Sequence, residues 1–152
     1  MDKKEGYTLI ELVISLSIII ILLSIGVGIS SSIIKVKKDM YIKQEIYEVL
    51  DIIHYGKACA SNLGEFGKIK FTMKDNTLEV KLTINDEIKR KVELDNLRLY
   101  KNYALDYMLH YKILFIKQDG TVECSTLIFK DSMDNRHVIT ISVGENNIRL
   151  KE

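Results

Sequence analysis

A single carboxylate, Glu11, stands near the start of a long apolar stretch. Residues 7–34 carry no other charge, and residues 12–34 are rich in isoleucine and leucine. A carboxylate at the centre of a membrane helix costs about 2.5–3.5 kcal/mol, and somewhat less near the interface. An ordinary signal sequence or membrane anchor has no use for such a group. The position therefore indicates a carboxylate that pairs with a cationic partner in apolar surroundings.

The apolar stretch is long enough to cross a bilayer. As a helix rising about 1.5 Å per residue, residues 12–34 would extend about 34 Å, against about 30 Å for the hydrocarbon core. We therefore expect residues 7–34 to form a transmembrane helix. A buried core helix is one alternative, although the rest of the chain could hardly cover it on every face. A cleaved secretory signal is the other, with Gly28 and Ser30 preceding a mature start at Ser31.

The residues around Glu11 form a pattern that follows a short hydrophilic leader. Its members are Gly6, Tyr7, Thr8, Leu9, Ile10 and Glu11. The pattern resembles the N-terminal motif of the type IV prepilin family, which includes pilins and the pseudopilins of type II secretion and competence systems. Phenylalanine is commoner in that family at the position of Tyr7. Asp2 and Glu5 offset the two lysines of the leader and weaken its positive-inside signal.

The resemblance implies a role for three residues of the motif. A membrane-embedded aspartyl prepilin peptidase would cleave between Gly6 and Tyr7 and methylate the new amine of Tyr7. A residue without a side chain suits a backbone that lies extended in a protease cleft. In the filament, Glu11 would pair with the Tyr7 amine of a neighbouring subunit, so that neither charge is buried alone. Residues 1–6 are then the leader peptide.

Helical periodicity continues beyond residue 34 to about residue 63. Apolar residues recur at steps of three and four, at Ile42, Ile46, Val49, Leu50 and Ile53. This spacing predicts one apolar helix face, with Lys43, Glu45, Glu48 and Asp51 away from it. Gly64 is a natural helix stop. We expect one long helix, half transmembrane and half amphipathic.

After Gly64 the apolar period changes to two, which predicts strands. Turn residues at 75–76, 85–86 and 119–120 separate the alternating segments, and residues 97–109 are ambiguous. Strands and helices do not alternate, so the sheet should be mainly antiparallel. We therefore expect an α+β, type IV pilin-like fold. In its globular domain, residues 35–152, the second half of the helix packs on a meander of about six or seven strands.

The later strands carry a second, weaker resemblance. It consists of Phe115 in a strand, a turn at Asp119 and Gly120, the segment 139–142, and Gly144 before a terminal strand. These features look like those of H-type minor pseudopilins, FimT-like minor pilins and ComGD-like competence pseudopilins. The resemblance favours a minor subunit over a major one.

Neither catalysis nor a cofactor is indicated. His54, His110 and His137 lack metal-ligand spacing, so we expect no metal site and interpret each as a surface or hydrogen-bonded histidine. No phosphate-binding loop or nucleophile elbow occurs. Cys59 and Cys124 are the two cysteines of the chain. The sequence leaves open whether they form a disulfide or remain free thiols, because it does not give their separation.

The overall charge does not favour a dedicated nucleic-acid binder. The chain of 152 residues has 22 basic and 21 acidic side chains, and a net charge of +1. Near the C-terminus, Arg149 and Lys151 could touch DNA if the protein serves DNA uptake. Two charges alone make too few phosphate contacts for useful affinity at physiological salt.

These observations predict a structural subunit: a minor pilin or pseudopilin of a bacterial type IV pilus (a fimbrium), or of a type II secretion or competence pseudopilus. The expected partners are the prepilin peptidase, other pilin or pseudopilin subunits, the inner-membrane assembly platform, and membrane lipid before assembly. The expected location is the cell membrane, with a single pass and the C-terminal domain outside the cytoplasm, and then the filament. The alternative is a secreted or membrane-anchored binding domain that does not polymerise.

Overall fold

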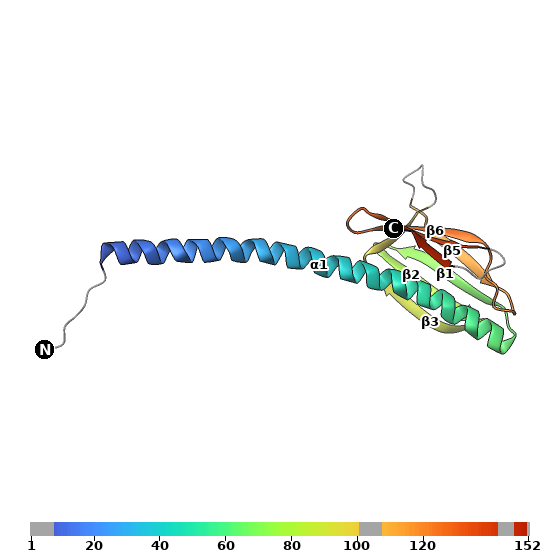
Figure 1. Cartoon of the computed structure of the whole chain (residues 1–152). Coiled ribbons are helices and arrows are strands. Elements are labelled where there is room, and N and C mark those ends of the chain that lie inside the picture. The colour runs from blue at the N-terminus through green and yellow to red at the C-terminus, as the bar shows by residue number, and fades with distance from the viewer. Residues whose placement is uncertain (1–7, 101–107, 143–147, 152) are drawn as a thin grey trace. The chain divides into compact units, whose positions relative to one another are not determined.

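The computed structural model describes residues 8–100, 108–142 and 148–151, except for the side chains of residues 25–31. One long helix, α1 (Leu9–Leu63), precedes the strands (Figure 1). The chain divides into two compact units, Met1–Met40 and Tyr41–Glu152. The predicted α+β fold, with a helix packed on antiparallel strands, is confirmed.

Eight strands form two four-stranded sheets over the described residues. They are β1 (Gly67–Lys74), β2 (Thr77–Ile84), β3 (Glu87–Leu94), β4 (Leu97–Tyr100), β5 (Tyr111–Ile116), β6 (Ser125–Asp131), β7 (Arg136–Ile141) and β8 (Ile148–Lys151). Sheet A has the order β3-β2-β1-β5, and sheet B has the order β4-β6-β7-β8. Every strand pair in the two sheets is antiparallel.

The prediction of one continuous meander is wrong. The chain meanders through β1, β2 and β3, but β4 then leaves sheet A and pairs with β6, while β5 returns to the free side of β1. β4 occupies the first four residues of the ambiguous segment 97–109, and the chain changes sheets just before it, between Leu94 and Leu97. The change of sheet is explained by the two leucines of β4. In sheet B, Leu97 and Leu99 are fully buried in the core that the two sheets share.

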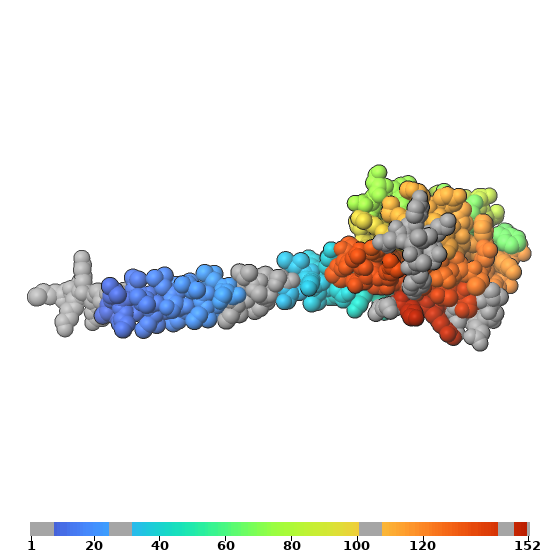
Figure 2. Space-filling view, turned by 90° about the horizontal axis from the view of Figure 1, so that it is seen from above, coloured from blue at the N-terminus to red at the C-terminus, as the bar shows by residue number. Residues whose placement is uncertain are grey.

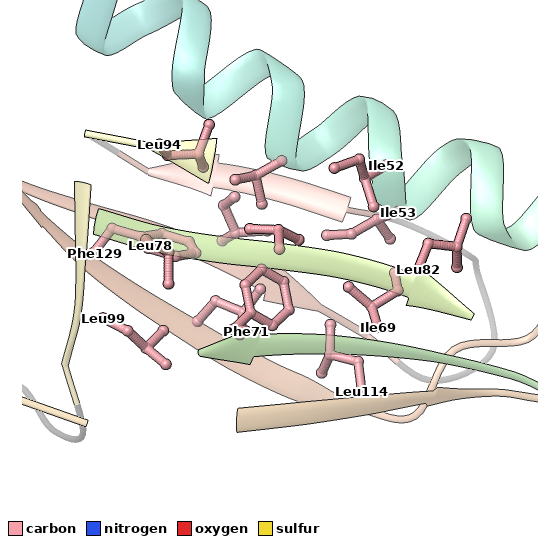
Figure 3. Close-up of a cluster of buried hydrophobic side chains, with 14 of the residues drawn as sticks. Ile52, Ile53, Ile69, Phe71, Leu78, Leu82, Leu94, Leu99, Leu114 and Phe129 are labelled. Atoms are coloured by element: carbon pink, nitrogen blue, oxygen red, sulfur yellow. The ribbon is translucent and has the colours of Figure 1, made fainter. Parts of the chain in front are cut away.

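The core lies between the second half of α1 and the two sheets. Six buried side chains of the helix enter it: Ile42, Ile46, Val49, Ile52, Ile53 and Ala60. Figure 3 shows Ile52 and Ile53 above Ile69 and Leu82 of sheet A. The predicted apolar face is thus confirmed, with Leu50 half-buried at its margin. The rings of Phe71 in β1 and Phe129 in β6 lie 6.2 Å apart and connect the sheets.

Local sequence explains where the elements end. Gly64 adopts a φ of 64°, and the amide of Glu65 donates to the carbonyl of Ala60 at 3.1 Å, which closes the helix in a Schellman-type cap. Asn85 and Asp86, with φ values of 48° and 60°, form the two-residue turn between β2 and β3. Positive φ at both central residues is the requirement of a type I′ hairpin turn, which Asn and Asp tolerate.

Polar contacts of Glu45 and Asp51 join α1 to the strands. The Glu45 carboxylate accepts from the Asn96 amide at 3.0 Å and from Asn96 Nδ2 at 2.7 Å, in the β3–β4 turn. Burial raises the pKa of the Glu45 carboxyl, and the bonds from Asn96 act against that rise. Asp51 Oδ2 lies 2.6 Å from Arg90 Nη1 of β3. Both carboxylates lie outside the buried apolar face, as predicted, with Asp51 exposed and Glu45 half-buried at its edge.

Membrane crossing by residues 7–34 is not confirmed. Within the part of the chain that the structure describes, no helix offers a stretch that is long and apolar enough to span a bilayer.

The helix approaches sheet A most closely at Gly56. A Cβ atom there would lie 2.8 Å from Ile116 Cδ1 and 2.9 Å from Leu82 Cδ1. Gly56→Val should therefore lower the free energy of unfolding by about 1–3 kcal/mol through overpacking, although valine has the higher helix propensity. Chemical denaturation of the full chain in non-ionic detergent measures this change.

Ala58→Val is the matched control, because Ala58 is exposed on the same helix. Its expected cost is about 0.5 kcal/mol of helix propensity. Equal losses in the two variants would contradict the close packing at Gly56.

Candidate functional site

The N-terminus of α1 is closed by two residues of the sequence motif. The backbone amide and the hydroxyl of Thr8 both donate to Glu11 Oε2, each at 2.8 Å. In return, the Glu11 amide donates to Thr8 Oγ1 at 3.4 Å. Since α1 begins at Leu9, Thr8 is the N-cap residue and Glu11 is the third residue of the helix. The arrangement is a capping box, which satisfies amides that the helix itself leaves without acceptors.

The spacing of Thr8 and Glu11 is itself a sequence signal for this cap, separate from the assembly role expected of Glu11. A threonine followed three residues later by a glutamate, ahead of an apolar run, predicts a capping box. A negative charge in the first turn also interacts favourably with the helix dipole. Glu11 therefore has hydrogen-bond partners within its own chain.

A long apolar surface follows the capping box. Large exposed side chains of α1 in this surface are Leu9, Ile10, Leu12, Val13, Ile14, Leu16, Ile18, Ile19, Ile20, Ile21, Leu22 and Leu23, each at least half exposed. Figure 2 shows residues of this segment, in blue, at the surface. Contiguous exposed apolar area of this extent marks a site for protein–protein or membrane contact.

Gly6 and Tyr7, the predicted cleavage and methylation residues, lie outside the described residues, as does the leader of residues 1–6. Thr8 follows them directly and begins the described chain. The structure therefore brings together Thr8 and Glu11, and the roles of Gly6 and Tyr7 remain predictions.

The two cysteines are free thiols. Cys59 is half-buried on α1, and Cys124 is exposed before β6. Of the two arrangements that the sequence left open, the structure has the one without a disulfide.

His137 is a hydrogen-bonded histidine, in keeping with its interpretation from sequence. Its Nε2 lies 2.9 Å from Asp131 Oδ2, while His54 and His110 are exposed at separate places. Among the described residues, no group of three or more His, Cys, Asp or Glu side chains could hold a metal ion. Two open hollows flank Phe115, and the described residues that line the one beside Cys124 include no histidine.

Comparison with known proteins identifies the N-terminal segment. Residues 1–27 match the family model of the prokaryotic N-terminal methylation motif, which is the cleavage and methylation signal of type IV prepilins. No curated protein and no solved structure matches the chain. The predicted resemblance to prepilins is thus confirmed, without a subtype. The motif supports a type IV pilin-like precursor, and its family is structural rather than enzymatic.

The capping box generates a prediction for the start of α1. Thr8→Val preserves the shape of the side chain and removes both hydrogen bonds of the hydroxyl. The loss should destabilise the first turn by about 1 kcal/mol, which corresponds to roughly fivefold faster hydrogen exchange at the Glu11 amide. Exchange measured by NMR on the full chain in detergent micelles tests this.

Ser15→Ala serves as the control, because the Ser15 hydroxyl donates to the Glu11 carbonyl within the helix and caps nothing. Exchange at the Glu11 amide that is unchanged in Thr8→Val would show that the capping box does not hold the helix start.

Proposed function

We propose that the protein is a minor pilin or pseudopilin that is cleaved by a prepilin peptidase and assembled into a filament through α1. The motif at residues 1–27 implies processing by that peptidase and assembly with other pilins. The observation that carries the proposal is the single carboxylate, Glu11, at the head of an uncovered apolar surface. An exposed apolar surface of this extent is a site for contact with another protein or with lipid. Once another protein covers it, the Glu11 carboxylate is buried and requires a cationic partner.

Assembly would cover the exposed side chains of α1 with the helices of neighbouring subunits. The Tyr7 amine of one subunit then meets Glu11 of another in apolar surroundings. The hydrogen bonds from Thr8 hold the Glu11 carboxylate at the start of the helix, where that amine can reach it. A capped carboxylate costs less side-chain entropy to pair than one that rotates freely.

Before assembly, we propose, the same apolar surface lies in lipid. The protein is then a single-pass protein of the cell membrane, with the Tyr41–Glu152 unit outside the cytoplasm, where an assembly platform recruits it. The filament can be a type IV pilus, a type II secretion pseudopilus or a competence pseudopilus. The second half of α1 serves a different purpose, since its apolar face is already buried in the core.

Processing is the first consequence to test. Protein isolated from its native host should lack residues 1–6 and carry an N-methylated Tyr7, because the peptidase cleaves after Gly6 in the matched motif. Intact-mass analysis with sequencing of the N-terminal peptide measures both changes. A chain that begins at Ser31 would instead establish a secretory signal and a protein that does not polymerise.

The role of Glu11 in assembly is tested by Glu11→Gln. The amide side chain still accepts from Thr8, so the helix start is preserved, but its charge is lost. Recovery of the protein in sheared filaments should fall about tenfold or more, because a neighbour's Tyr7 amine is then buried without its counter-ion at a cost of several kcal/mol. Cleavage at Gly6 should be unaffected.

Glu123→Ala provides the matched control, since it removes an exposed carboxylate that lies outside α1. Equal recovery of wild type, Glu11→Gln and Glu123→Ala would remove the assembly role from Glu11. Absence of the wild-type protein from the filaments would favour an anchored binding domain that never polymerises.

A further inference from the structure

The strand β5 forms one edge of sheet A and carries exposed aromatic side chains (Figure 1). Its residues alternate, so that Leu114 is buried in the core while Tyr111 and Phe115 face outward, 63% and 55% exposed. The residues opposite them on β1 are polar, namely Thr72 and Lys68. Polar side chains are typical of a solvent-facing strand. The aromatic side chains of β5 instead indicate a surface that another protein covers.

The free side of β5 also presents backbone groups for hydrogen bonding. His110 faces β1, because its carbonyl accepts from an amide of that strand at 2.8 Å. Phe115 faces the opposite way, because its carbonyl accepts from the Glu123 amide at 3.0 Å. Since this direction alternates along a strand, Tyr111 and Ile113 also direct their N–H and C=O groups to the free side. Among the described residues, neither has a backbone partner there.

The chain itself places an extended residue on this side of β5. Val122 forms an antiparallel bridge with Ile116, beside the end of the strand. The chain then leaves for β6, which belongs to sheet B. The positions beside Tyr111 and Ile113 continue the same line. An antiparallel segment placed there would form a hydrogen-bonded pair with each of these two residues.

Between these two positions stands a lysine that points toward the core side of sheet A. Lys112 lies opposite the buried Phe71 and is itself half-buried. Its Nζ donates to the carbonyl of Thr126 in β6 at 2.5 Å, and burial lowers the pKa of its ammonium group. Within the part of the chain that the structure describes, no carboxylate pairs with this group. A carboxylate brought beside it would stabilise its charged form.

Lys112 also determines which kind of partner fits the edge. If two copies of the chain paired antiparallel through Tyr111 and Ile113, Lys112 of one copy would lie directly opposite Lys112 of the other. Side chains are closest at such a non-hydrogen-bonded position, and like charges there destabilise the pair. Inward-pointing charges on edge strands protect proteins against self-pairing in this way. An acidic residue of another protein would supply the missing counter-ion at the same position.

We infer that the free edge of β5 binds an extended segment of another protein as an additional antiparallel strand, with an acidic residue opposite Lys112 and apolar residues opposite Tyr111 and Ile113. Backbone hydrogen bonds supply affinity, and the alternating side chains supply specificity. The apolar residues pair across the strands with the exposed side chains of β5. The edge lies in the Tyr41–Glu152 unit and is separate from the N-terminal motif. The inference therefore goes beyond the proposed function and does not depend on filament assembly.

Fluorescently labelled peptides that contain the segment Thr-Val-Glu-Val-Thr test the charge preference. They are titrated with the full chain in non-ionic detergent, and companion peptides carry Gln or Lys in place of the central Glu. The Glu peptide should bind about fivefold more tightly than the Gln peptide, and the Lys peptide should bind most weakly. Lys112→Gln should abolish this ranking, because the ranking depends on the charge of the lysine.

Lys117→Gln is the matched control, since Lys117 is exposed just beyond β5. This variant should keep the ranking of the three peptides. Loss of the ranking in both variants would show a general effect of charge and would overturn the inference. So would a Glu peptide that does not bind at millimolar concentration.

The backbone hydrogen bonds are tested by Ile113→Pro. Proline removes the N–H that points to the free side and leaves the bonds to β1, which come from the alternate residues. Binding of the Glu peptide should fall about tenfold or more. Ile113→Ala keeps the amide and should lose only about threefold. Equal losses in the two variants would contradict strand addition.

Circular dichroism checks that each variant is folded. If Ile113→Pro does not fold, hydrogen exchange in the wild-type chain carries the test. The amides of Tyr111 and Ile113 should exchange about tenfold more slowly with saturating Glu peptide, because they gain acceptors. Unchanged exchange at both amides would overturn the inference. Wild-type dimers that Ile113→Ala or Ile113→Pro abolishes would overturn it in favour of pairing between copies.

Discussion

The apolar face of α1 between Ile42 and Ala60 must be buried away from water, and the two sheets of the folded unit pack so as to cover it. Sheet A lies against the helix, at its closest near Gly56, and sheet B adds Phe129 against Phe71 of sheet A. Polar groups lie at the border of this contact. Glu45 accepts hydrogen bonds from Asn96, in the turn that leads the chain from one sheet to the other. Burial of one helix face thus determines both the layering of the strands and the place where the chain changes sheets.

Local features of the fold could be predicted from the sequence, and the pairing of distant strands could not. The buried face of α1 was predicted from its helical periodicity and its end from Gly64. Both features depend on interactions between residues that are close in the sequence. The hairpin turn at Asn85 and Asp86 is local in the same way. The exchange of partners between β4 and β5 is not, because alternating residues fit either sheet equally well. Only the shared core, where Leu97 and Leu99 are buried, selects the pairing.

The same distinction applies to the functional surfaces. The motif ending at Glu11 is contiguous, so it could be recognised directly, and its capping box with Thr8 has a local spacing as well. The contact of Glu45 with Asn96 has no such signature, because the two residues are far apart in the sequence and meet only in the folded unit.

The packing of α1 also has a mechanical consequence. The helix portion in the Tyr41–Glu152 unit is held by side chains from Ile42 to Ala60, spread over several turns, and by the pair of Asp51 with Arg90. A pull along the helix axis would load these contacts together, in shear, and would not open them one after another as peeling does. Since each contact bears only a share of the tension, the unit should withstand axial force better than force applied across the helix.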